Sequence, residues 1–243
     1  MAKINQEKCQ GCKECLILCP DEAISYANGK CFVDPNKCTE CYFCLRHSIC
    51  PNNAFETTEL DTYIKQFQHV ISDPAESHGI KKGVTGRGAE EVKTLDVTGR
   101  LKRGSAGITI DVGRPGLGVY LRDVEKIAMA VIKAGVEIPP GEKSPLGSIM
   151  PDRSTGKLYP EYLDYRFHSL ILEGNFQEAQ LPEVMKALKE VENKIETVFT
   201  VGLVLRVDDN CYNKALDCLD ELDIPKPHRG KINLGLGRPL ATD

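Results

Sequence analysis

The chain has 243 residues, of which 41% are hydrophobic and 27% charged, and its formal net charge is −4. This composition is typical of a soluble globular protein, the length leaves room for two domains, and the acidic balance argues against generic nucleic-acid binding. The first residues lack the apolar run of a secretion signal and no long uncharged apolar run follows, so we expect a cytoplasmic protein without a membrane span.

The cysteines are concentrated at the N-terminal end. The chain contains 11 cysteines, and nine of them are Cys9, Cys12, Cys15, Cys19, Cys31, Cys38, Cys41, Cys44 and Cys50. Disulfides are rare in cytosolic proteins because cytosolic thiols are kept reduced. The density therefore indicates a metal site.

Eight of these cysteines form two similar frames. The first frame is Cys9-x2-Cys12-x2-Cys15-x3-Cys19-Pro20, and the second is Cys38-x2-Cys41-x2-Cys44-x5-Cys50-Pro51. Three closely spaced thiols on one loop can reach three corners of a 4Fe-4S cluster, and in two-cluster proteins the fourth cysteine of each run ligates the other cluster. We therefore predict two 4Fe-4S clusters, one on Cys9, Cys12, Cys15 and Cys50 and the other on Cys38, Cys41, Cys44 and Cys19.

Two features leave alternatives open. Zinc is the main competing metal, although zinc sites usually combine two C-x2-C pairs instead of three cysteines in sequence. The x5 spacer of the second frame is longer than the x3 spacer of the first, so a bent loop or a shifted potential is expected there. Cys31 lies outside both frames, and we expect a half-buried thiol at this position and not a ligand.

The repeat extends beyond the thiols. Each proline is followed by a small and then a large apolar residue, Ala23-Ile24 in the first copy and Ala54-Phe55 in the second, and Asn28-Gly29 between the frames predicts a hairpin. On these motifs, residues 1–58 resemble the dicluster bacterial ferredoxins, which implies one-electron transfer. The segment has few large apolar side chains, so the clusters are expected to supply part of its folding free energy.

The composition changes over residues 59–103, where glycines recur and basic residues outnumber acidic ones between Gly79 and Gly104. We interpret this segment as a glycine-rich basic linker or loop. It is either a solvated connection or a loop that receives an anionic ligand or a docking partner.

Regular elements return in residues 104–243. Apolar periodicity predicts strands over 106–112, 167–176, 197–207 and 232–236, alternating with helices over 124–131, from Pro182 and over 211–222. Gly135 is expected to end the first of these helices, and Cys211 and Cys218 are expected to be core thiols. The fold class is therefore α+β: a small dicluster ferredoxin domain followed by a two-layer α/β sandwich, with the choice between antiparallel ferredoxin-like pairing and a mixed or parallel sheet left open.

Three Gly-Arg pairs stand at the edges of the predicted elements: Gly99-Arg100, Gly113-Arg114 and Gly237-Arg238. They are either turns with solvated arginines or a convergent set, Arg100, Arg114 and Arg238, that holds a carboxylate, a phosphate or a partner. No histidine has a sequence neighbour that indicates catalysis, so we assign no catalytic residue.

A second resemblance covers nearly the whole chain. Besides the cysteine frames, it rests on the segments 86–94 (GRGAEEVKT), 113–116 (GRPG) and 235–239 (GLGRP). With these motifs the chain resembles the iron-sulfur part of 6-hydroxynicotinate reductase-type proteins, which implies ferredoxin-linked reduction of an N-heterocyclic carboxylate in anaerobic metabolism. That family has a further region that this chain lacks, which argues against self-sufficient catalysis.

The sequence therefore favours an iron-sulfur electron-transfer protein or subunit. We expect it to relay single electrons through two 4Fe-4S clusters to or from a larger redox enzyme, a flavin- or metal-containing partner with which it would form a hetero-oligomer. A reductase that acts on a heterocyclic substrate itself is the alternative, and a redox sensor or scaffold is a more distant one.

Overall fold

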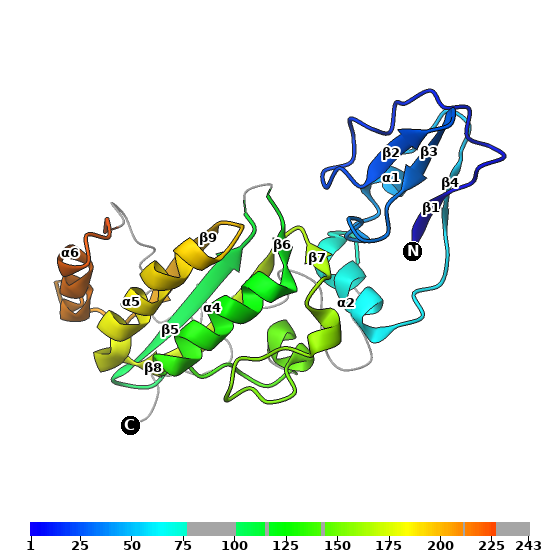
Figure 1. Cartoon of the computed structure of the whole chain (residues 1–243). Helices are drawn as coiled ribbons and strands as arrows, with labels where there is room; N and C mark the ends of the chain where they lie inside the picture. Colours follow the sequence, from blue (N-terminus) through cyan, green and yellow to red (C-terminus); the bar gives the residue numbers. More distant parts are fainter. Residues whose placement is uncertain (77–100, 115–116, 142–143, 211, 227–243) are drawn as a thin grey trace.

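Helix α2 (Tyr63–Ser72) lies between a small N-terminal lobe and a larger body (Figure 1). The computed structural model describes residues 1–76, 101–114, 117–141, 144–210 and 212–226. Within these ranges, helices and small antiparallel sheets alternate, which confirms the α+β class. No helix among the described residues is long and apolar enough to cross a membrane.

Two short antiparallel pairs frame the lobe. Strand β1 (Ala2–Ile4) pairs with β4 (Phe55–Thr57), and β2 (Ile24–Ala27) forms a hairpin with β3 (Lys30–Val33). Asn28 and Gly29 both have positive φ, 50° and 78°, as a tight two-residue hairpin turn requires. The predicted hairpin is confirmed. The lobe's one helix is α1 (Phe43–Arg46), which lies within the second cysteine frame.

The hydrophobic core of the lobe is small. Its buried members are Ile4, Cys9, Cys15, Ile24, Cys31 and Ala54. Three of these six residues are cysteines, so there is little aliphatic surface to bury, and burial of apolar surface is the dominant favourable term in folding. We therefore expect the folding of the lobe to require stabilisation by a group that its thiols bind.

Helix α2 falls within the segment interpreted as a linker. Its buried face carries Ile64, Phe67, Val70 and Ile71, which join the core of the body, and the Phe67 ring packs edge-on against Phe167 at 5.7 Å between centroids. This part of 59–103 is therefore an ordered structural element. Residues 77–100 of the same segment lie outside the described residues.

The body is built on a three-stranded sheet in the order β8-β5-β9, formed by β5 (Ser105–Val112), β8 (Leu170–Gln177) and β9 (Phe199–Val204). Both neighbours run antiparallel to β5, which resolves for these strands the choice that the sequence left open. Apolar residues alternate with Gly107, Thr109 and Asp111 in the first strand, which predicts one buried face, but Gly107 and Thr109 are buried as well. Leu101 contacts the position of Gly107, and Thr109 faces Gly202 of β9.

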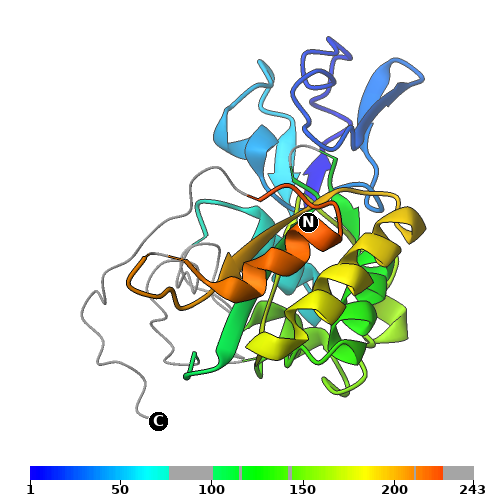
Figure 2. The same cartoon turned by 90° about the vertical axis from the view of Figure 1, so that its left-hand side faces the viewer.

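Helices α4 (Leu121–Lys133) and α5 (Leu181–Val191) pack side by side on one side of this sheet (Figures 1 and 2). Helix α4 buries the predicted stripe of Val124, Ile127, Ala128 and Val131. The helix ends at Lys133, and Gly135, which follows the C-cap residue Ala134, has a φ of +105° that suits glycine at a helix end, as predicted.

Shorter elements complete the described part. Strands β6 (Val119–Tyr120) and β7 (Arg166–Phe167) pair with each other beside α2. The five 3₁₀ turns are Pro145–Ile149, Pro160–Tyr162, Glu178–Gln180, Glu192–Lys194 and Lys214–Asp217. The helix expected over 211–222 is shorter than expected: the last of these turns leads directly into α6 (Cys218–Glu221). Because the expected strand over 232–236 lies outside the described residues, the two-layer sandwich stays a prediction.

Candidate metal centre

Two hollows in the lobe are lined by cysteines. The first hollow spans about 320 Å³, including the open space at its mouth, and its cysteines are Cys9, Cys12, Cys15, Cys31 and Cys50. The second spans about 370 Å³, likewise including its mouth, and its cysteines are Cys19, Cys38, Cys41 and Cys44. We call them the outer cage and the inner cage. Each combines three cysteines of one frame with the last cysteine of the other, which is the grouping that the spacing predicts.

The sequence repeat is also a repeat of backbone conformation. Gly11 and Glu40, which directly precede the second cysteine of each frame, both have left-handed backbones, with φ of 69° and 55°. The residues that follow this cysteine, Lys13 and Tyr42, have φ of 71° and 53°. Left-handed conformations cost non-glycine residues about 1–2 kcal/mol each. Three of the four residues are not glycine, and the left-handed conformation nevertheless recurs at the same positions in both copies, which indicates that the two loops are shaped for the same kind of group.

Backbone amides point at the sulfurs. The amides of Ala23 and Ala54, at equivalent positions of the two copies, donate to the preceding frame's last sulfur, on Cys19 at 3.3 Å and on Cys50 at 3.4 Å. In the outer cage, the Cys31 amide also donates to Cys9 Sγ at 3.4 Å. Such donors favour a negatively charged thiolate, the form that ligates iron. The thiols and their donors thus fit a 4Fe-4S cluster in each cage.

Burial raises the pKa of several of the thiols. It raises the pKa of Cys15, Cys38 and Cys44 to about 12 in each case, because a thiolate in these surroundings would be desolvated. The pKa of Cys9 is lowered instead, first by its hydrogen bond from the Cys31 amide. A metal that binds here must displace protons, so cluster assembly is expected to release them.

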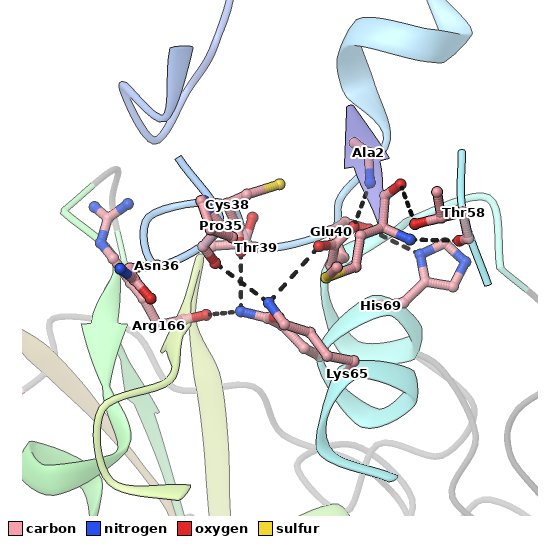
Figure 3. Close-up of polar contacts among 12 residues, drawn as sticks. Ala2, Pro35, Asn36, Cys38, Thr39, Glu40, Thr58, Lys65, His69 and Arg166 are labelled. Atoms are coloured by element: carbon pink, nitrogen blue, oxygen red, sulfur yellow. Dashed lines mark hydrogen bonds and ion pairs between the residues drawn. The ribbon is translucent and has the colours of Figure 1, made fainter. Parts of the chain in front are cut away.

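Helix α2 ties the inner cage to the body (Figure 3). The Lys65 ammonium lies 3.7 Å from the Glu40 carboxylate, and both side chains are at most 9% exposed. Gln68 uses one amide nitrogen to donate to two carbonyl oxygens, of Cys38 at 3.1 Å and of Arg166 at 2.6 Å. His69 Nδ1 lies 2.8 Å from the Glu40 carbonyl oxygen. The backbone of the second frame is thus held by side chains that lie outside the cysteine motif.

A second link to the body centres on Asp21, which follows Pro20 at the end of the first frame. Its carboxylate accepts hydrogen bonds of 2.6 Å from Arg166 Nη1 and of 2.6 Å from Thr39 Oγ1, and it lies 3.2 Å from Nδ1 of His168. Burial alone lowers the pKa of His168, but hydrogen bonding with Asp21 and then with Cys41 outweighs it and raises the pKa to about 9. An oxygen of Asp21, Sγ of Cys41 and a ring nitrogen of His168 all lie within 4.8 Å of one another.

Sequence reasoning missed these surrounding residues. Lys65, Gln68, Arg166 and His168 stand up to 147 positions from their partners in the lobe, the largest separation being that of His168 from Asp21, and nothing in their local sequence marks them. His168 was one of the histidines to which we assigned no role. Contacts between residues so far apart in the sequence form only when the body packs against the lobe, so local sequence patterns do not predict them.

The other predicted residues have different outcomes. Cys31 is 1% exposed and not half-buried, because it faces the outer cage from β3. Cys218 is buried, as expected for a core thiol, whereas Cys211 lies outside the described residues. Of the three arginines proposed to converge, Arg114 donates to Ser169 Oγ at 3.2 Å, and Arg100 and Arg238 lie outside the described residues.

The comparison with known protein families found one match: residues 2–25 match a family model described as a 4Fe-4S binding domain. No curated protein and no solved structure matches the chain. The matched residues include the whole first frame. The N-terminal segment is therefore a metal-binding 4Fe-4S domain of the ferredoxin type, which indicates iron-sulfur electron transfer.

Proposed function

We propose that this chain is an electron-transfer protein or subunit with two 4Fe-4S clusters. One cluster would bind Cys9, Cys12, Cys15 and Cys50, and the other Cys19, Cys38, Cys41 and Cys44. The observation that supports this proposal most directly is the presence of two hollows of similar size, in each of which three cysteines of one frame meet the last cysteine of the other. A bound cluster supplies one-electron chemistry, because its iron ions share a single added electron.

The protein's own residues would hold and insulate these clusters. Backbone amides stabilise the thiolates, and the buried lobe core excludes water from one side of each cage. The x5 spacer also has a use in the inner cage: its Arg46 donates to the Cys41 carbonyl oxygen at 2.7 Å and pairs with Asp73 at the end of α2. The longer spacer therefore gives the second frame an additional link to the helix.

We further propose that the electrons pass to or from a larger flavin- or metal-containing enzyme. The two cages are unequal in their surroundings: Cys12 of the outer cage is exposed, whereas Cys38 and Cys41 of the inner cage have partners on α2 and beside β7. This arrangement suits a relay in which the exposed outer cluster exchanges electrons with one protein and the inner cluster is held against the body.

The first experiment is anaerobic isolation of the full chain, with quantification of iron, acid-labile sulfide and zinc. We expect about eight irons per chain, given four per cluster. Cys12→Ser should lose iron, and Cys218→Ser, which alters a buried thiol in the body, should retain all of it. Zinc in place of iron, or full iron retention in Cys12→Ser, would refute the ligand assignment.

The second experiment addresses the role in electron transfer. Copurification of the full chain under anaerobic conditions should yield a larger redox enzyme that the reduced chain can reduce. Turnover of an N-heterocyclic carboxylate by the isolated chain, with dithionite as donor and no second protein, would instead support the reductase alternative.

A further inference from the structure

His168 is held in a fixed position beside the inner cage. It lies in the short connection between β7 and β8, and its neighbours Phe167 and Leu170 are both fully buried in the core of the body. The imidazole contacts the lobe with both ring nitrogens: Nδ1 lies 3.2 Å from Asp21 Oδ2, and Nε2 lies 3.3 Å from Thr39 Oγ1. The ring is thus anchored in the body and aligned by the lobe.

The polar atoms around the His168 ring are hydrogen-bond acceptors, so the ring nitrogens act as donors. The Thr39 hydroxyl donates its proton to Asp21, so its oxygen is free to accept from Nε2. Asp21 is 3% exposed and also pairs with Arg166, so its carboxylate is a fixed acceptor for Nδ1. Cys41 Sγ, a thiolate when it binds iron, is the remaining polar atom in this group.

Among the described residues, the outer cage shows no equivalent arrangement at the matching positions. Cys12 is the counterpart of Cys41 in the first frame, and its side chain is exposed. Asn52 is the counterpart of Asp21 in the second copy, so the repeat has a neutral amide where the inner cage has a carboxylate. The two cages thus share their backbone conformation and differ in this contact with the body.

Hydrogen bonds to cluster sulfurs are one of the determinants of reduction potential. A donor lowers the free energy of the reduced cluster more than that of the oxidised one, because reduction adds negative charge that the sulfurs share. We propose that His168, held by Asp21 and Thr39, shares one of its ring N–H groups with the Cys41 sulfur, which lies within 4.8 Å of a ring nitrogen, and thereby makes the inner cluster the more easily reduced of the two. This inference rests on the proposed function. It implies that the inner cluster holds the electron when the chain is reduced by one electron. His168 is a positioning residue, since it acts through Cys41.

The test is an EPR-monitored redox titration of the anaerobically isolated full chain, with dithionite as the electron donor. Wild type should show two one-electron steps. In His168→Leu, the equilibrium constant for the upper step should fall about tenfold, a shift of about 59 mV for one electron, while the lower step stays in place. His47→Leu is the comparison, because it removes an exposed imidazole of the same lobe that stacks on Phe43 and, within the described part of the chain, has no hydrogen bond to a cysteine sulfur. It should shift the upper step by less than His168→Leu does.

Two further measurements make the outcome decisive. With isotopically labelled histidine, the cluster reduced at the upper step should show a nitrogen hyperfine coupling that His168→Leu removes. Asp21→Asn, which copies the residue of the other repeat, should shift the upper step in the same direction as His168→Leu. An unchanged upper step in His168→Leu, or a shift of the lower step only, would overturn the inference. If wild type instead holds one cluster, the proposed function fails, and iron quantification distinguishes that result from failure of the role of His168.

Discussion

Gly11 offers the sharpest test of how the outer cage is built. The residue has φ of +69°, and a Cβ added there would lie 2.1 Å from the carbonyl oxygen of Gly29. Non-bonded carbon atoms pack at about 3.5–4.0 Å, so this added atom would force the cysteine loop away from the hairpin. Gly29 itself has φ of +78°, but a Cβ there would meet nothing within 4 Å. Gly11→Ala and Gly29→Ala therefore share the backbone penalty and differ in the steric overlap.

The backbone cost and the cost of the steric overlap can each be given a magnitude. A left-handed alanine costs about 1–2 kcal/mol, which both variants pay. The overlap at Gly11 adds about 1–3 kcal/mol, the usual range for overpacking, and it falls on a lobe with a small aliphatic core. We expect Gly11→Ala to empty the outer cage while the inner cage keeps its cluster, whereas Gly29→Ala retains both.

The assay is iron per chain, with EPR spin quantification after reduction. We expect about four irons per chain in Gly11→Ala and about eight in Gly29→Ala, given four per cluster. Thermal unfolding under anaerobic conditions provides the second readout and should show the lower melting temperature in Gly11→Ala. Equal iron content and equal melting temperatures in the two variants would refute the argument that this close approach shapes the outer cage.

Three other predictions concern the buried ion pair of Lys65 and Glu40, the Cys31 thiol in the outer cage, and the removal of iron. Lys65→Met should lower the free energy of unfolding by about 3–5 kcal/mol in anaerobic urea titrations because it leaves the buried Glu40 carboxylate without its cation. Lys3→Met, which breaks an exposed pair, should cost under about 1 kcal/mol, and equal effects would contradict this reasoning. Cys31→Ala should keep all of the iron, since we assign this buried thiol no ligand role, and loss of half the iron would show that it ligates. Removal of iron by a chelator should abolish amide hydrogen-exchange protection in residues 1–58 and preserve it in β5 and α4; protection that persists in the lobe would show that its core suffices.

The sequence predicted local features well. The hairpin at Asn28-Gly29, the apolar stripe of α4 and the helix end at Gly135 all follow from residues close together in the chain, and the structure confirms each of them. The grouping of the cysteines in the two hollows also agrees with their spacing. These features depend on periodicity and turn chemistry, which a single sequence displays directly.

What the sequence did not predict depends on distant contacts. Helix α2 was interpreted as part of a linker because glycines and charges dominate the residues after it, although Phe67 packs on Phe167. The second face of β5 was expected to be exposed, and it is covered by Leu101 and by the neighbouring strand. The contact of His168 with Asp21 joins residues that local patterns cannot relate.

The shared amide of Gln68 limits how the protein can move. One nitrogen bridges a carbonyl of the cysteine loop and a carbonyl of strand β7, and this side chain is 1% exposed. A swinging carrier, which shuttles between donor and acceptor on a hinge, would have to break both bonds in a place that water does not reach. If the chain is the electron carrier proposed above, these two bonds favour a lobe that stays fixed on the body, so that electron-tunnelling distances do not vary with hinge motion.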